Sequence, residues 1–135
     1  MKKLLIPALA LGLFAFTPAQ ADEETPLGEQ MEILNDSYKA FRRTDDPAEG
    51  AKLAREAQAS VIKGMSMTPD FVEKGGHPGG KEKAMVSYRK QMAQLLITLC
   101  EVEEAFLAKD MDKVQELITP LKDSKKKGHD EFIEE

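Results

Sequence analysis

A regular run of apolar residues in the second half of the chain constrains the fold more than any other feature. Its members are spaced alternately three and four positions apart: Met85, Tyr88, Met92, Leu95, Leu99, Val102 and Phe106. This spacing keeps apolar side chains on one face of an α-helix and is typical of helices that pack in a bundle. The sequence therefore predicts a long bundle helix through this region.

A second apolar stripe with the same spacing begins at Leu27. Thr25 is suited to be the N-cap of this helix and Pro26 to be its first residue, where a missing N–H costs nothing. The apolar positions that follow are Leu27, Met31, Leu34, Tyr38 and Phe41. We expect this first helix to pack in the same bundle.

Two further helices complete the pattern. Asp46-Pro47 begins one of them, with Glu49 placed to complete a capping box, and its buried face is narrow. The members of that face are Leu53, Ala57, Val61 and either Gly64 or Met65.

The last helix runs from about residue 112 to residue 133, and Pro120 should kink it or remove one backbone hydrogen bond. Its stripe is Val114, Leu117, Leu121, Gly128 and Phe132.

The connections between these segments set the topology. Residues 68–80 are rich in Gly and Pro and are expected to form a flexible loop, whereas residues 109–112 make a short turn. Short turns join antiparallel neighbours. The sequence shows no strand-like alternation, so we predict an all-α fold, an antiparallel up-down-up-down four-helix bundle, as one domain over residues 22–135.

The N-terminus indicates export. Lys2 and Lys3 precede an apolar run from Leu4 to Phe16, and Ala19-Gln20-Ala21 is a small-x-small cleavage site. The run is shorter than the roughly 20 apolar residues that a membrane-spanning helix needs. We therefore expect residues 1–21 to be a signal peptide that is cleaved, and the mature protein to be soluble in a bacterial periplasm.

Charge and cysteine content narrow the function. Without its two signal-peptide lysines the chain keeps 17 Lys and Arg against 24 Asp and Glu, a net charge of −7. An acidic chain disfavours binding to nucleic acid and to anionic membranes, and it would suit a basic protein partner.

Cys100 is the only cysteine, which excludes an internal disulfide and a Cys-x-x-Cys-His haem attachment. We expect Cys100 to be a small buried hydrophobe.

Met31 and His129 are the candidate ligands. In an antiparallel bundle the first and last helices place Met31, near the start of one, at the level of His129, near the end of the other. A thioether and an imidazole facing each other across a core can ligate a haem iron from both sides. Gly128 leaves room for a macrocycle, and Lys125, one turn earlier, could meet a propionate at the pocket edge.

Other interpretations stay open at this point. A Met on a helix stripe is more often core filler than a ligand, and a His near a helix end is often solvated. His77 is expected to be a surface loop histidine, although Met65 and Met67 near it could form a soft copper(I) site. No Glu-x-x-His motif of a di-iron bundle occurs, and nothing supports hydrolysis or group transfer, so we do not expect an enzyme.

The two ends of the mature chain resemble the soluble cytochrome b562 family. The resemblance is carried by residues 31–36 with Lys39, and by Leu121-Lys122 followed by His129. It implies a periplasmic four-helix bundle that holds one haem b non-covalently, with Met31 and His129 as axial ligands. It also implies an electron carrier, which we expect to be a monomer with an unidentified periplasmic redox partner. The alternative is a cofactor-free or metal-binding helical bundle that has lost haem binding.

Overall fold

Four long helices and one single-turn helix make up most of the computed structural model, which describes residues 25–133. In chain order they are α3 (Pro26–Arg43), α4 (Pro47–Met65), α5 (Asp70–Glu73), α6 (Lys81–Leu107) and α7 (Met111–Phe132). No strand occurs within residues 25–133. The predicted all-α four-helix fold is confirmed. The expected signal peptide and the start of the expected domain lie outside the described residues.

The starts of α3 and α4 follow from local hydrogen bonds. Thr25 Oγ1 accepts from the Gly28 backbone N–H at 2.9 Å, and the Asp46 carboxylate accepts from the Ala48 N–H at 3.0 Å. The capping box predicted for α4 is wrong in one respect. The Asp46 N–H, assigned there to Glu49, donates instead to Thr44 Oγ1 at 3.1 Å, because that hydroxyl is only two residues away.

The turn between α6 and α7 is a Schellman motif. The Asp110 N–H donates to the Ala105 carbonyl at 2.8 Å and the Lys109 N–H to the Phe106 carbonyl at 2.9 Å. Asp110 then caps α7 by accepting from the Lys113 N–H at 3.1 Å. Helix α7 continues through Pro120, which lies on its exposed face, where water can satisfy the carbonyl that loses its partner.

Apolar and small side chains fill the space between the helices. The largest fully buried side chains include Phe41, Leu99 and Phe106. The predicted narrow face of α4 is confirmed at Ala57, Val61 and Gly64, whereas Leu53 is only half-buried. The buried residues of α4 are Gly50, Ala51, Ala54, Ala57, Ser60, Val61 and Gly64. A Cβ at Gly50 would lie 2.3 Å from the Phe106 ring, so only glycine allows α4 and α6 to approach this closely.

The prediction that Cys100 is buried is wrong, since the structure exposes it. The apolar stripe of α6 passes through Leu99, which is 1% exposed, and the next residue is turned about 100° around the helix, toward solvent. Although the residue is exposed, partial desolvation of its thiol, followed by the negative charges of Glu103, Glu104 and Glu101, raises the pKa of Cys100. The thiol is therefore kept in its protonated, less nucleophilic form.

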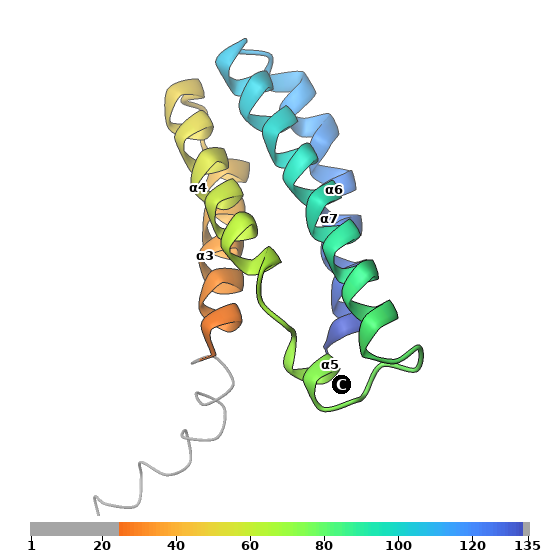
Figure 1. The fold of residues 1–135 in the computed structure, drawn as a ribbon. Coiled ribbons are helices and arrows are strands. Elements are labelled where there is room, and N and C mark those ends of the chain that lie inside the picture. Colours follow the sequence, from red (N-terminus) through yellow and green to blue (C-terminus); the bar gives the residue numbers. More distant parts are fainter. Residues whose placement is uncertain (1–24, 134–135) are drawn as a thin grey trace, which may run out of the picture.

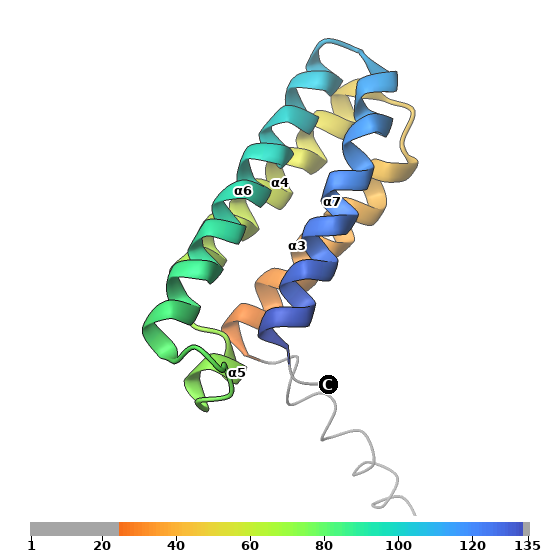
Figure 2. The same cartoon turned by 90° about the vertical axis from the view of Figure 1, so that its right-hand side faces the viewer.

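The helices form two hairpins, α3 with α4 and α6 with α7, joined where α4 packs against α6 (Figure 1). The hairpins lie close together at the end that carries the two short turns and spread apart at the opposite end. At that open end α3 begins, α7 ends and α5 lies, as the perpendicular view in Figure 2 also shows. This arrangement brings the first turns of α3 to the level of the last turns of α7.

The segment predicted to be a flexible loop is more ordered than expected. It contains helix α5, and Val72 within that helix is 1% exposed. Burial of this one aliphatic side chain anchors the segment to the bundle, because apolar area is removed from water. Within the part of the chain that the structure describes, no helix is long and apolar enough to cross a membrane.

Candidate functional site

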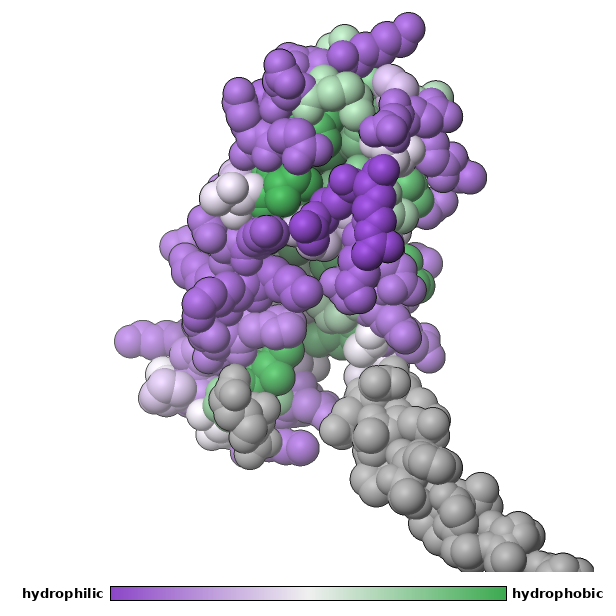
Figure 3. All heavy atoms as spheres, turned by 180° about the vertical axis from the view of Figure 1, so that it is seen from behind, coloured by the Kyte–Doolittle hydropathy of each residue, from purple (hydrophilic) through white to green (hydrophobic). Residues whose placement is uncertain are grey.

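A cavity of about 1120 Å³ occupies the open end of the bundle. The first turns of α3, the segment around α5, the middle of α6 and the last turns of α7 line it. Pockets for small molecules and cofactors run to roughly 300–1,000 Å³, so this one is large enough for a sizeable ligand. Seen from the side opposite to Figure 1, hydrophobic side chains are visible between mainly polar outer surfaces (Figure 3).

The three residues singled out from the sequence, Met31, Lys125 and His129, all line this cavity. Met31 is half-buried, and its methyl group lies near α4, 3.4 Å from where a Cβ of Gly64 would be. His129 and Lys125 are exposed residues at the rim. The fold thus brings the thioether and the imidazole, which are far apart in sequence, to the walls of one cavity.

Lys125 also bridges the two helices on either side of the cavity. Its ammonium donates to Asn35 Oδ1 of α3 at 3.2 Å. Both residues line the cavity. The contact places a positive charge at the opening, where the carboxylate of a bound ligand could replace the Asn35 amide oxygen as acceptor.

The interior of the cavity is mostly apolar. The aliphatic and thioether side chains on its walls are Leu27, Leu34, Met92, Leu95, Leu99 and Leu121. Tyr88 Oη donates to the Gly64 carbonyl at 2.7 Å, and burial raises the pKa of Tyr88 to about 12. Tyr38 Oη is buried without a hydrogen-bond partner among residues 25–133, so it is a polar atom left available on this wall.

The structure places His77 in a contact that the sequence did not reveal. The expectation of a surface loop histidine is wrong, because its side chain is only 14% exposed and Nε2 lies 2.9 Å from Glu131 Oε2. Nδ1 accepts from the Gly79 N–H at 3.1 Å. With both ring nitrogens engaged, His77 has no lone pair free for a copper ion shared with Met65 and Met67. Its partner is 54 positions away, and no local pattern signals such a contact.

Glu131 is held as a carboxylate by its neighbours. Burial acts to raise its pKa, but hydrogen bonds from His77, Ser87 and Gln91 outweigh that effect and lower it. Gln91 Nε2 donates to Glu131 Oε1 at 2.6 Å. The last turn of α7 is therefore tied both to α6 and to the loop that carries His77.

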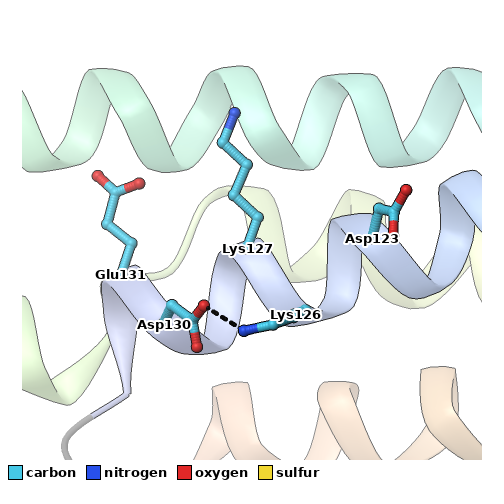
Figure 4. A pocket seen from close by; sticks show the side chains of 5 residues that line it. All are labelled: Asp123, Lys126, Lys127, Asp130 and Glu131. Atoms are coloured by element: carbon cyan, nitrogen blue, oxygen red, sulfur yellow. Dashed lines mark hydrogen bonds and ion pairs between the residues drawn. The ribbon is translucent and has the colours of Figure 1, made fainter.

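A second, shallower hollow of about 400 Å³ lies on the outer side of α7. It is lined only by charged residues: Asp123, Lys126, Lys127, Asp130 and Glu131 (Figure 4). Lys126 pairs with Asp130 at 2.9 Å, one turn along the helix. Such a hollow offers no apolar wall for an organic cofactor, and it agrees with a solvated face for this lysine-rich stretch.

The chemistry of the large cavity narrows the class of ligand. Within residues 25–133 no group of three His, Cys, Asp or Glu side chains is placed to hold a metal ion. The cavity is lined instead by one imidazole, that of His129, and by the thioethers of Met31, Met67 and Met92, and an imidazole with a thioether is a donor pair found on haem iron. The apolar walls suit the faces of a macrocycle, and the lysine at the rim suits its carboxylates.

Comparison with known families points to the same class of cofactor. The family model described as Cytochrome b562 matches residues 26–132. The chain belongs to the cytochrome b562 family. No curated protein and no solved structure gave a significant match. Membership in the cytochrome b562 family suggests a haem-binding helical bundle, and the match spans all four long helices that surround the cavity.

Proposed function

We propose that this protein is a periplasmic electron carrier that binds one haem b non-covalently, with Met31 and His129 as the two axial ligands. The single observation that carries the proposal is that Met31, His129 and Lys125 line one largely apolar cavity. The two ligands come from α3 and α7, and a bundle core with ligands on facing helices is a recurrent cofactor site.

Each residue of the site has a distinct task in this proposal. Met31 supplies a soft thioether from a half-buried position, and His129 supplies an imidazole nitrogen from the rim. The leucines of the walls exclude water from the ligand's faces. Lys125, which donates to Asn35 Oδ1, would be free to pair instead with a propionate through a charge-assisted hydrogen bond.

The ligand set determines the type of chemistry. A bound haem b supplies a one-electron Fe(III)/Fe(II) couple, and a Met ligand raises its potential. Met31 and His129 would both be needed to hold the iron and would leave no open position for oxygen, so we propose a carrier and not an enzyme. Release of the ligand is opposed by the apolar walls, since leaving the cavity would expose them to water.

The location and partner follow from the rest of the chain. We propose that residues 1–21 direct export and are removed after Ala21, so that the mature monomer acts in the periplasm. Its net charge of −7, from 17 basic and 24 acidic residues, favours a basic redox protein as the partner. The proposed function involves neither binding to nucleic acid nor insertion into a membrane.

The experiment is a haemin titration of the purified apoprotein, comparing the parent with Met31→Ala and His129→Ala. Met85→Ala is the matched control, because Met85 is also a half-buried methionine but does not line the cavity. We expect one equivalent of haemin to bind the parent and the control as a six-coordinate low-spin complex. Met31→Ala should become five-coordinate, and His129→Ala should release haem faster. Unchanged spectra in both ligand variants would overturn the ligand assignment.

One observation favours a second candidate function. The His129 side chain is exposed and its imidazole makes no hydrogen bond within residues 25–133, whereas Phe132, one turn later, fills the buried position on the inner face of α7. A bundle that has lost haem and binds another apolar ligand or a protein in the same cavity would have this appearance. It predicts that the parent fails to take up haemin at all.

A further inference from the structure

His77 joins the glycine-rich loop to the last turn of α7. Its Nε2 lies 2.9 Å from Glu131 Oε2, and its ring stacks on Phe132 with centroids 5.9 Å apart and planes inclined by 22°. Phe132 in turn meets the Tyr88 ring edge-on at 5.4 Å. A polar and an aromatic contact therefore act on two consecutive residues of α7.

The hydrogen bonds of His77 define its tautomer. Nδ1 accepts from the Gly79 N–H at 3.1 Å and so carries no proton, which leaves the proton on Nε2 to be donated to Glu131. A neutral imidazole thus satisfies both partners at once. Gly79 closes the loop around the ring, so the position of His77 is fixed from the loop side as well.

Glu131 extends the connection to a third element. Its Oε1 accepts from Gln91 Nε2 of α6 at 2.6 Å, and Figure 4 shows its side chain pointing from α7 toward α6. Its other oxygen, Oε2, lies 2.9 Å from His77 Nε2, so both carboxylate oxygens are engaged. The loop, α6 and α7 therefore meet at one side chain.

These contacts lie between two walls of the large cavity. Phe132 and His129 line it from α7, and Phe71 and Lys74 line it from the segment that leads to His77. The loop is packed tightly on its own helix, because a Cβ at Gly76 would lie 2.4 Å from the Phe71 ring. A displacement of His77 would therefore move both walls.

We propose that His77 is a positioning residue that holds the last turn of α7, and with it His129, in place for the cofactor. This inference rests on the proposed haem function. His77 acts through Glu131 and Phe132 and does not ligate, since both of its ring nitrogens are already engaged. Groups that orient a metal ligand from outside typically change metal affinity or activity by roughly 10–100-fold when they are removed.

The test compares His77→Ala, His77→Phe and His77→Gln with the parent. His77→Phe keeps a ring on Phe132 without the hydrogen bond, and His77→Gln restores an N–H donor toward Glu131. Lys81→Ala is the matched control, because Lys81 ties the same segment to Glu73 at 2.9 Å through exposed side chains only. Two quantities are measured: amide hydrogen exchange of the apoprotein, and transfer of haem from the loaded protein to an excess of apomyoglobin.

In the apoprotein, His77→Ala should speed exchange of the Ile133 N–H, which donates to the His129 carbonyl at 3.1 Å. In the loaded protein it should release haem roughly 10–100-fold faster. His77→Phe should lie between the parent and His77→Ala, His77→Gln should recover part of the loss, and Lys81→Ala should match the parent. Recovery by a donor is not expected of a histidine that only fills space.

Exchange and release rates of His77→Ala equal to those of Lys81→Ala would overturn the proposal. If the parent takes up no haemin, the proposed function fails, but exchange at Ile133 still decides whether His77 holds the helix end. Should His77→Ala not fold, the comparison of His77→Phe with His77→Gln in the same two measurements decides the question.

Discussion

Two tyrosine hydroxyls near the cavity differ in whether the protein satisfies them. Tyr88 Oη donates to the Gly64 carbonyl at 2.7 Å, whereas Tyr38 Oη has no partner among residues 25–133. The Tyr38 ring is well packed, edge-on to Phe41 with centroids 5.6 Å apart and beneath the Arg42 guanidinium at 5.2 Å. Packing therefore fixes Tyr38 even though its hydroxyl is unpaired.

This difference predicts opposite effects of the same substitution. Tyr38→Phe should leave the free energy of unfolding of the apoprotein unchanged or raise it by up to about 1 kcal/mol, because it removes a buried unsatisfied donor. Tyr88→Phe should lower it by about 1 kcal/mol, because a made hydrogen bond is lost. Urea unfolding at neutral pH measures both. A larger loss for Tyr38→Phe than for Tyr88→Phe would contradict this interpretation.

Tyr88 also predicts a dependence of stability on alkaline pH. Burial raises its pKa from 10.0 to about 12, so the folded protein resists ionisation of this hydroxyl. The resulting stability is fully present below pH 10 and is lost as the pH rises toward about 12, by on the order of 2–3 kcal/mol. The difference in unfolding free energy between the parent and Tyr88→Phe, measured in urea from pH 8 to 11, should shrink as the pH rises. A constant difference would show that burial does not shift this hydroxyl.

At the scale of the element, the turn after α6 carries local strain. Lys109 has a φ of +58°, in the left-handed region, at the position of a Schellman motif where glycine is most favourable. A side chain with a Cβ is disfavoured in this region, whereas glycine adopts it freely. The hydrogen bonds of the motif hold Lys109 there.

Lys109→Gly should therefore stabilise the protein by roughly 0.5–1 kcal/mol. The gain should appear in urea or thermal unfolding of the apoprotein, without any change in haemin binding, because the turn lies at the end of the bundle away from the cavity. Lys109→Ala is the matched control, since it removes the same charge but keeps the Cβ. Equal stability of the two variants would show that the backbone conformation at Lys109 carries no strain.

The helices and the segment between α4 and α6 differ in how far the sequence could predict them. The four long helices and the caps at Thr25 and Asp46 follow from apolar spacing and local hydrogen bonds, so the sequence predicted them. The order of the 68–80 segment depends on Val72 reaching the core and His77 reaching Glu131, contacts between residues far apart in the chain. The candidate ligands were predictable because topology alone brings Met31 and His129 to one end, but their unequal burial was not.

At the scale of the whole molecule, the two hairpins meet at one end and diverge at the other. Their divergence leaves a cavity between them without interrupting any of the four long helices. Small residues on α4 let the hairpins approach, and α5 with its loop covers part of the divergent end. The fold therefore leaves about 1120 Å³ unfilled at the one place where the two candidate ligands lie. A ligand that fills this space would stabilise the folded state by mass action.

The charge of the molecule predicts how electron exchange should depend on salt. Because residues 22–135 carry 17 basic and 24 acidic residues, reduction of the loaded protein by a cationic ruthenium ammine should slow as ionic strength rises. Reduction by an anionic reagent such as dithionite should become faster under the same conditions. Stopped-flow rates from 10 to 500 mM salt would measure both. The same response to both reagents would show that net charge does not steer the encounter.

We propose that Met31 and His129 hold a haem iron between α3 and α7. The visible spectrum of the protein expressed from the full sequence tests this, before and after reduction with dithionite, for the parent and for His129→Ala. We expect sharp α and β bands of a six-coordinate low-spin haem in the reduced parent, and their loss in the variant. A colourless parent that also fails to take up added haemin, or identical bands in the two proteins, would contradict the claim.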